Sequence, residues 1–419
     1  MKRIFLIGLF LPLMSWGVMA QQSDLNYRFY GQVRTDFYYN SRANAELVDG
    51  LFHLYPKDRL LDANGKDLNA TPDGGTYLLY SRVGMDITSK GKTTWRGKIE
   101  VDFRGSGSSY SIFRLRHAFL EHTWSVGKKR WAKVLVGQTW HPLFGTVYPR
   151  VLNLGTGAPY QPFSRAPQVR ASYGIGPWQL MMAAVWQSQF LSQGIDPTDA
   201  TKTVRSQAFL KKGLWPECYA GVDYKRGPWS WGGGVEVLSL KPRTNSIMPD
   251  GKIYSVNERI TTISCELHGS YTTPHWFVAG KSVWGANLTQ TLSLGGFGIS
   301  NIDSATGRQE YTPLRYSTSW INVVHGVKWK KGIFAGYAKN LGTSQPLATG
   351  TVLYGTGTEL DRLSTVGLEL SYNKSNWQIG AEYTLTTAHY GNLNRESGQV
   401  SSTHAVCNHR IVGVAIWSF

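Results

Sequence analysis

The stretch GKTTWRGKIEVDFRG, residues 91–105, alternates strictly between two kinds of side chain. From Trp95 to Phe103 every second residue is aromatic, aliphatic or glycine, and the residues between them are arginine, lysine, glutamate and aspartate. A period of two predicts an extended strand with one apolar and one charged face. Such a strand can lie in a soluble sheet, or in a membrane barrel with lipid outside and a water-filled lumen inside.

The beginning of the chain predicts export. Lys2 and Arg3 precede a short apolar run, and a small-residue cleavage site ends at Ala20. This order is typical of a secretory signal peptide, and the run is shorter than the roughly 20 residues of a spanning helix. We expect a signal peptide at 1–20 and a mature bacterial protein at 21–419.

Composition favours a membrane barrel over a soluble sheet. The chain has 46 glycines, 16 tryptophans, 22 tyrosines and 16 phenylalanines, with only 17% charged residues. Its mean hydropathy of −0.26 does not exclude a membrane protein, because barrel strands carry apolar residues only at alternate positions. No linker or shift in composition divides the chain, so we expect one all-β unit.

The segment 25–40 repeats the alternation with aromatic residues at both ends of its apolar face. Tyr27 and Phe37 lie ten residues apart on that face. At about 3.3 Å per residue and a tilt of roughly 40°, they bracket a height of about 25 Å. This is the height of the apolar band of a membrane β-strand, and soluble strands are usually shorter.

Further segments of the same kind predict about sixteen strands in a closed antiparallel transmembrane β-barrel. The turns between them are short on one side, for example the two GPW turns, and mostly long on the other. This asymmetry is typical of outer-membrane barrels, with short periplasmic turns and long extracellular loops. The long connections are predicted at 41–76, 141–167, 191–215, 242–255, 289–313, 341–361 and 388–402.

Two adjacent motifs, FRLRHAFLEHTW and AKVLVGQTWHPLFG, resemble outer-membrane porins of the Bacteroidota and, more loosely, the phosphate-selective porin family. The resemblance covers about 35 residues. It implies a homotrimer among outer-membrane lipid and lipopolysaccharide that lets small hydrophilic solutes diffuse passively, without cofactor or enzymatic activity. Phosphate selectivity is not implied, because no single loop carries a matching arginine series.

The connection 141–167 holds five prolines and several large apolar residues. Apolar side chains seek burial, so this loop should not extend into solvent. It is the third connection on the extracellular side when the short connection GSGSSY (105–110) is counted, and in porin-like barrels the third loop folds inward and narrows the pore. We expect Arg150 and Arg165 to help form this constriction. The alternative is that the loop covers the barrel mouth or a subunit contact.

The alternation also predicts which basic residues face the lumen. They are Arg28, Arg34, Arg82, Arg96, Lys98, Arg104, Arg114, Arg116, Arg170 and Lys281. Basic groups around a pore favour anions through charge complementarity, and the formal charge of +17 agrees with this prediction. The alternative is that these residues pair with Asp36, Asp86, Glu100, Asp102 and Glu382, which leaves little selectivity.

The sequence therefore predicts an outer-membrane diffusion porin with anion preference. The alternatives of a substrate-specific channel for phosphate or sugars, and of a structural or adhesive barrel, remain open.

Nucleic acid is not an expected partner of an exported chain, and no enzyme motif or metal site is predicted. His404 faces away from Cys407 and His409 on a strand, so these three do not form a metal site. The chain has three cysteines, Cys218, Cys265 and Cys407. Because this number is odd, they cannot form a complete disulfide framework.

Overall fold

The computed structural model describes residues 25–419 except 48, 49, 51, 90–93, 107, 108, 154 and 249, and it leaves out the side chains of 104–111. The predicted signal peptide at 1–20 lies outside the described residues. Among the described residues, no helix is long and apolar enough to cross a membrane.

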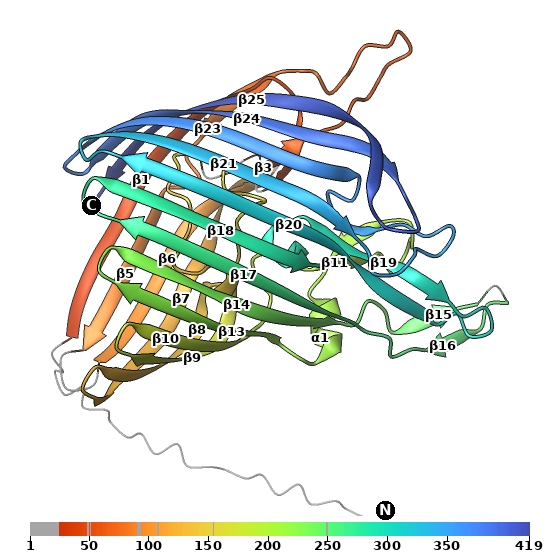
Figure 1. The fold of residues 1–419 in the computed structure, drawn as a ribbon, viewed down its shortest axis with the longest axis horizontal. Helices are drawn as coiled ribbons and strands as arrows, with labels where there is room; N and C mark the ends of the chain where they lie inside the picture. Colours follow the sequence, from red (N-terminus) through yellow and green to blue (C-terminus); the bar gives the residue numbers. More distant parts are fainter. Residues whose placement is uncertain are drawn as a thin grey trace, which may run out of the picture.

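Within this part of the chain, 16 long antiparallel strands form a closed barrel (Figure 1). Each pairs with its neighbour along the chain, and β1 also pairs with β25 from Gln32 opposite Ser418 to Asn40 opposite Arg410. The barrel strands are β1 (Leu25–Asn40), β5 (Arg82–Ser89), β6 (Thr94–Ser106), β7 (Ser109–Gly127), β8 (Arg130–Trp140), β9 (Arg165–Ile175), β10 (Trp178–Val185), β13 (Glu217–Arg226), β14 (Trp229–Leu240), β17 (Ile260–Thr272), β18 (Trp276–Ala286), β20 (Gln309–His325), β21 (Trp329–Gly342), β23 (Leu360–Lys374), β24 (Trp377–Leu393) and β25 (Val400–Ser418).

Short turns gather at one end of the barrel, next to the C-terminus, and longer connections at the other end (Figure 1). The longer connections carry small elements of their own. These are β2 (Asn44–Leu47), β3 (Phe52–Pro56), β4 (Asp73–Tyr77), η1 (Pro142–Phe144), β11 (Gln193–Ile195), β12 (Thr203–Arg205), α1 (Ala208–Gly213), β15 (Asn245–Ile247), β16 (Ile253–Ser255), η2 (Thr289–Thr291), β19 (Gly295–Ile302) and β22 (Tyr354–Thr356).

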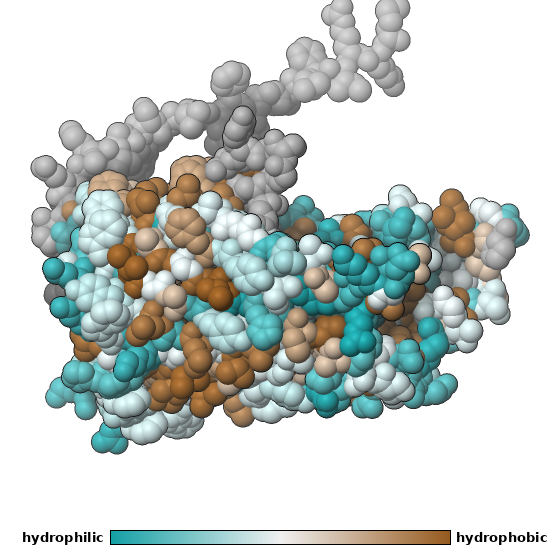
Figure 2. All heavy atoms as spheres, turned by 90° about the horizontal axis from the view of Figure 1, so that it is seen from above, coloured by the Kyte–Doolittle hydropathy of each residue, from teal (hydrophilic) through white to brown (hydrophobic). Residues whose placement is uncertain are grey.

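The alternating faces lie as the sequence predicts. On β6, Trp95 and Ile99 are 53% and 50% exposed on the outside, whereas Glu100 and Asp102 are 5% and 0% exposed inside. Figure 2 shows apolar residues gathered on the half of the barrel nearer the short turns, and more polar residues toward the other end. An outer belt of apolar side chains around a closed ring is the surface that a bilayer covers.

A tryptophan follows each short turn that joins two barrel strands in the described part of the chain. Trp131 is turned inward, toward Gly174 on the neighbouring strand. The outward ones, with exposed fractions of about one half, are Trp95, Trp178, Trp229, Trp276, Trp329 and Trp377. Amphipathic rings prefer the boundary between lipid and water, so these residues mark the periplasmic edge of the membrane belt.

The predicted strand ends agree best where the alternation is cleanest. The predicted strand 25–40 coincides with β1. The predicted connection 41–76 ends too early, because the next barrel strand, β5, starts only at Arg82 and β4 is a separate short strand.

The strict alternation also fails on β7. The pairing with β6 shifts between Glu100, which lies opposite His117, and Val101, which lies opposite Leu115. Arg116 is therefore the extra residue of a β-bulge.

We expect Ile99→Arg to destabilise the membrane-inserted barrel by about 2–4 kcal/mol, because it places a charge on the lipid face. Refolding into lipid vesicles at increasing urea concentrations measures this. Leu61→Arg, on an exposed extracellular segment, is the matched control and should leave the free energy of unfolding unchanged. Equal effects of the two substitutions would contradict the assignment of the outer face.

Candidate functional site: a constriction inside the barrel

The residues 141–164, called the inward loop below, fold into the lumen. Leu143 and Tyr160 of this loop are fully buried, with exposed fractions of 0%. Its hydrogen bonds reach β1, β18, β20, β23 and β24, which surround the lumen. The prediction that the connection 141–167 folds inward is confirmed.

The strongest attachment of the inward loop is Glu382 on β24. Its carboxylate accepts the backbone N–H of Leu152 at 2.7 Å and that of Asn153 at 2.8 Å, and it also accepts the hydroxyl of Thr156. Arg34 on β1 donates to the carbonyl of Leu152 at 2.6 Å. Glu382 therefore satisfies loop donors that would otherwise be buried without a partner.

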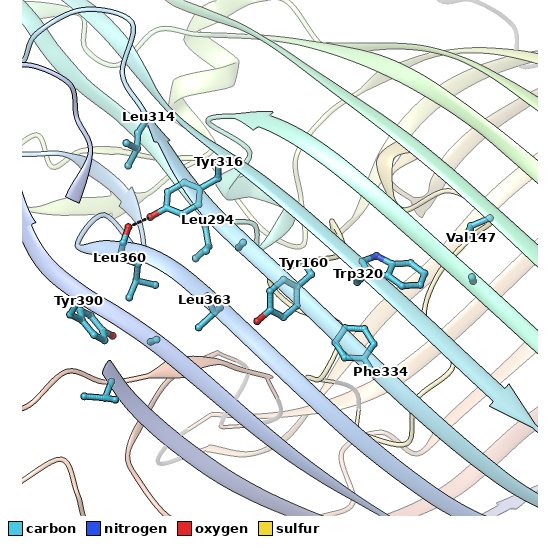
Figure 3. Packing of buried hydrophobic residues seen from close by; sticks show 14 of the residues in the cluster. Val147, Tyr160, Leu294, Leu314, Tyr316, Trp320, Phe334, Leu360, Leu363 and Tyr390 are labelled. Carbon is cyan, nitrogen blue, oxygen red and sulfur yellow. Dashed lines mark hydrogen bonds between the residues drawn. The ribbon is translucent and has the colours of Figure 1, made fainter. Parts of the chain in front are cut away.

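A second attachment lies on β20 and β23. The Tyr160 hydroxyl is 2.8 Å from that of Thr365, and the Trp320 indole N–H donates to Gln161 at 2.9 Å. Tyr160 lies close to Trp320 and to Phe334 of β21 (Figure 3). Burial raises the pKa of Tyr160, so the ring stays neutral in this apolar contact.

Lys281 on β18 faces the lumen, as predicted, but the inward loop covers it. Its ammonium donates to the carbonyls of Leu143 at 2.7 Å and Phe144 at 3.0 Å, and its side chain is buried. Glu266 lies 3.8 Å away. Lys281 is thus a buried attachment of the loop and not part of the open lumen surface.

Most of the predicted lumen arginines belong to a wall formed by β1, β5, β6 and β7, called the basic wall below. Several of them are paired with carboxylates. Asp86 is 3.1 Å from both Arg28 and Arg96 and 3.6 Å from Lys98. Arg34 pairs with Asp36 at 2.5 Å.

The β7 bulge brings Arg114 and Arg116 to the same carboxylate. Each guanidinium is 2.6 Å from Asp102, and Arg116 is also 2.6 Å from Glu100. These short charge-assisted contacts fix the side chains in place. The pairing that the sequence left as an alternative is therefore present for six basic residues of the basic wall.

Arg82 and Arg150 differ from these residues. Among the described residues, neither has a carboxylate within 4.0 Å. The Arg82 guanidinium lies 5.6 Å from the ring centre of Tyr80, and that of Arg150 lies 3.9 Å from the ring centre of Phe277. Arg150 lines three cavities beside the inward loop.

The remaining predicted residues have other surroundings. Arg165 is 1% exposed and stacks on Trp140 at 3.6 Å, behind the surface of the constriction. Arg170 donates to Gln168 and to the carbonyl of Trp140. The side chain of Arg104 lies outside the described part of the structure.

Opposite the basic wall, the end of β8 and the inward loop present aromatic rings. Trp140 and Phe144 stack with ring centres 3.9 Å apart, and Tyr148 continues the stack 5.2 Å from Phe144. A cavity of about 420 Å³ lies between these rings and the basic wall, where Arg82, Lys98 and Arg116 line it. The constriction therefore has one cationic and one aromatic side.

Sequence reasoning missed the aromatic stack and Glu382 as a loop attachment. The spacing of four residues between Trp140, Phe144 and Tyr148 was a possible signal for the stack. Glu382 gave no local signal, because its partners lie more than 200 residues away in the sequence.

Solved structures of similar fold are outer-membrane proteins. No family model and no curated protein matches the chain. The outer membrane channel DcaP of Acinetobacter baumannii has a TM-score of 0.64 at 16% identity, covering 94% of this chain and 97% of that one. OmpT of Vibrio cholerae has a TM-score of 0.53 at 13% identity, covering 94% and 98%. The Salmonella typhi OmpF complex with daunomycin has a TM-score of 0.52 at 11% identity, covering 94% and 97%.

This chain has the outer-membrane barrel fold. The identities are too low to carry an activity from any of these proteins to this one. The sequence resemblance to Bacteroidota porins and to the phosphate-selective family stays a prediction.

We expect Glu382→Ala to loosen the inward loop, because each buried donor left without a partner costs about 1–3 kcal/mol. Single-channel recording should show frequent current fluctuations that the wild-type channel lacks. Glu121→Ala, on β7, is the control because the Glu121 carboxylate pairs with Lys133 at 3.3 Å and makes no hydrogen bond to the inward loop among the described residues. A quiet Glu382→Ala channel would show that this carboxylate does not hold the loop.

Proposed function

We propose that this protein is an outer-membrane porin for passive diffusion of small hydrophilic solutes, with a preference for anions. The observation that carries the proposal is a pair of arginines, Arg82 and Arg150, which line the cavity between the basic wall and the inward loop. Among the described residues, neither has a carboxylate within 4.0 Å. A fixed positive charge in a narrow aqueous path lowers the entry barrier for anions and raises it for cations.

The balance of charge on the basic wall supports the proposal. Its inward-facing cations outnumber its carboxylates, so the ion pairs do not cancel the field. The cations with described side chains are Arg28, Arg34, Arg82, Arg96, Lys98, Arg114 and Arg116, and the anions are Asp36, Asp86, Glu100, Asp102 and Glu121. Arg150 adds to this excess from the inward loop.

The fold neighbours support the general part of the proposal. DcaP is described as an outer membrane channel, and OmpT of Vibrio cholerae as an outer membrane protein with a trimer form. We propose that this chain is likewise exported, inserted among outer-membrane lipid and lipopolysaccharide, and assembled as a homotrimer.

A second candidate is a channel selective for anions with an apolar body. The Phe144–Tyr148 stack favours it, because an aromatic surface facing cationic groups suits a solute that has both an apolar face and a negative charge. This differs from the phosphate or sugar channel left open by the sequence.

We expect the reversal potential across a KCl gradient in a planar bilayer to lie toward the chloride potential. In Arg82→Ala/Arg150→Ala it should move toward zero, because both unpaired charges are removed. Arg308→Ala, in an exposed extracellular turn, is the control and should match the wild type.

A wild-type reversal potential near zero with a large conductance would leave an unselective pore and contradict the anion preference. No conductance from folded protein would favour a structural or adhesive barrel.

The second candidate predicts that benzoate reduces the chloride current saturably and more strongly than phosphate or maltose. Phe144→Ala should weaken the benzoate block several-fold while it preserves the preference for chloride. Equal, non-saturating effects of the three solutes would support general diffusion instead.

A further inference from the structure

Four buried polar side chains meet where the inward loop begins. His141 precedes η1, Glu217 is the first residue of β13, Glu236 lies on β14, and Gln290 lies in η2. Their exposed fractions are between 0% and 1%. We call them the His141 cluster. It lies apart from the cavity beside the basic wall, which these residues do not line.

The cluster holds two carboxylates that have no lysine or arginine partner among the described residues. His141 Nε2 is 3.0 Å from Glu217 Oε2. Gln290 Nε2 donates to Glu217 at 3.1 Å and to Glu236 at 3.2 Å. In the described part of the chain, no lysine or arginine nitrogen lies within 4.0 Å of either carboxylate. Buried carboxylates are normally paired or bound to a metal ion.

Three oxygen atoms of the cluster lack a hydrogen-bond partner although they are buried. They are Glu217 Oε1, Glu236 Oε2 and Gln290 Oε1. Buried polar atoms in proteins almost always have a partner, so three such acceptors in one cluster indicate a missing ligand. A ligand that suits two carboxylates and an amide oxygen is a cation.

We propose that the His141 cluster binds one Ca²⁺ ion. A carboxylate oxygen of Glu217 and one of Glu236 lie within 4.8 Å of each other, and an ion with Ca–O distances of 2.3–2.6 Å can bridge such a separation. Rotation of the Gln290 amide by half a turn would bring its oxygen to the ion in place of its nitrogen. Carboxylate and amide oxygens are the donors that calcium prefers.

The ring of His141 favours calcium over zinc. Its Nδ1 accepts the backbone N–H of Leu143 at 3.2 Å, so the proton of the neutral ring lies on Nε2. A protonated Nε2 donates to Glu217 and offers no lone pair to a metal. The remaining donors are oxygens, which suit a hard cation, and magnesium would need a tighter octahedral set at 2.0–2.1 Å.

The ion would join the start of the inward loop to the barrel. It would hold Glu217 and Glu236 of two neighbouring strands together with η2, and His141 would orient Glu217 as a hydrogen-bond donor. Calcium would thereby add a fourth attachment of the loop, beside Glu382, the Tyr160 contact and Lys281.

The test is isothermal titration calorimetry of CaCl₂ into the mature protein, refolded without lipopolysaccharide and treated with EDTA. Lipopolysaccharide is left out because it binds divalent cations itself. We expect one Ca²⁺ per chain, with Mg²⁺ at least tenfold weaker. Glu217→Gln and Glu236→Gln should each weaken binding at least tenfold, whereas Glu369→Gln, at a half-buried carboxylate on β23, should not.

Three results would overturn the proposal. They are no calcium uptake by the folded wild-type protein, uptake that both glutamine variants retain, and uptake of Zn²⁺ in place of Ca²⁺. If the glutamate variants do not fold, Gln290→Leu decides, because it keeps both carboxylates and should still weaken calcium binding several-fold. The readout does not depend on conductance, so it is independent of the proposed channel function.

Discussion

An unpaired backbone amide inside hydrocarbon has no water to bond with, and the rest of this structure depends on that constraint. It requires β1 to close on β25, and the closure extends to the last residue. The N–H of Gly31 donates to the carbonyl of Phe419 at 3.0 Å, and the N–H of Phe419 donates to the carbonyl of Gly31 at 3.1 Å. Closure fixes the ring of strands, and the ring separates a lipid face from a lumen. Each side chain of a barrel strand then points to one of these two surroundings, and this gives the alternation of apolar and charged residues on strands such as β6.

A barrel of sixteen strands encloses a lumen wide enough for an aqueous channel. The inward loop narrows this lumen. Its backbone is not part of any sheet, so side chains of the barrel wall satisfy it: Glu382 binds its N–H groups, and Lys281 and Arg34 bind its carbonyls. Its apolar residues pack on an apolar part of the inner wall around Trp320 and Phe334. The same loop thereby fills one side of the lumen and leaves Arg150 opposite the basic wall. Selectivity and stability of the constriction thus depend on one set of contacts.

Much of the fold could be predicted from the sequence because a barrel strand is defined by local alternation. The range 25–40 coincides with β1 for this reason. The bulge at Arg116 could not be predicted, because it depends on the register between β6 and β7. Only the outline of the candidate site could be predicted from the sequence. Alternation placed Lys281 toward the lumen, but whether a loop covers it or a carboxylate neutralises its charge is decided by residues far away in the sequence. For the same reason, Arg82 could not be distinguished from its ion-paired neighbours.

The central claim is that the inward loop places a free positive charge in the path of the current. The most direct measurement replaces Arg150 by cysteine in a chain whose exposed native cysteines, Cys218, Cys265 and Cys407, are serine. The single channel is then treated with a negatively charged methanethiosulfonate reagent. We predict that the reagent lowers the conductance and removes the anion preference in each modified channel. Unchanged current and selectivity after complete modification would contradict the account, because the side chain of residue 150 would then lie outside the conducting path.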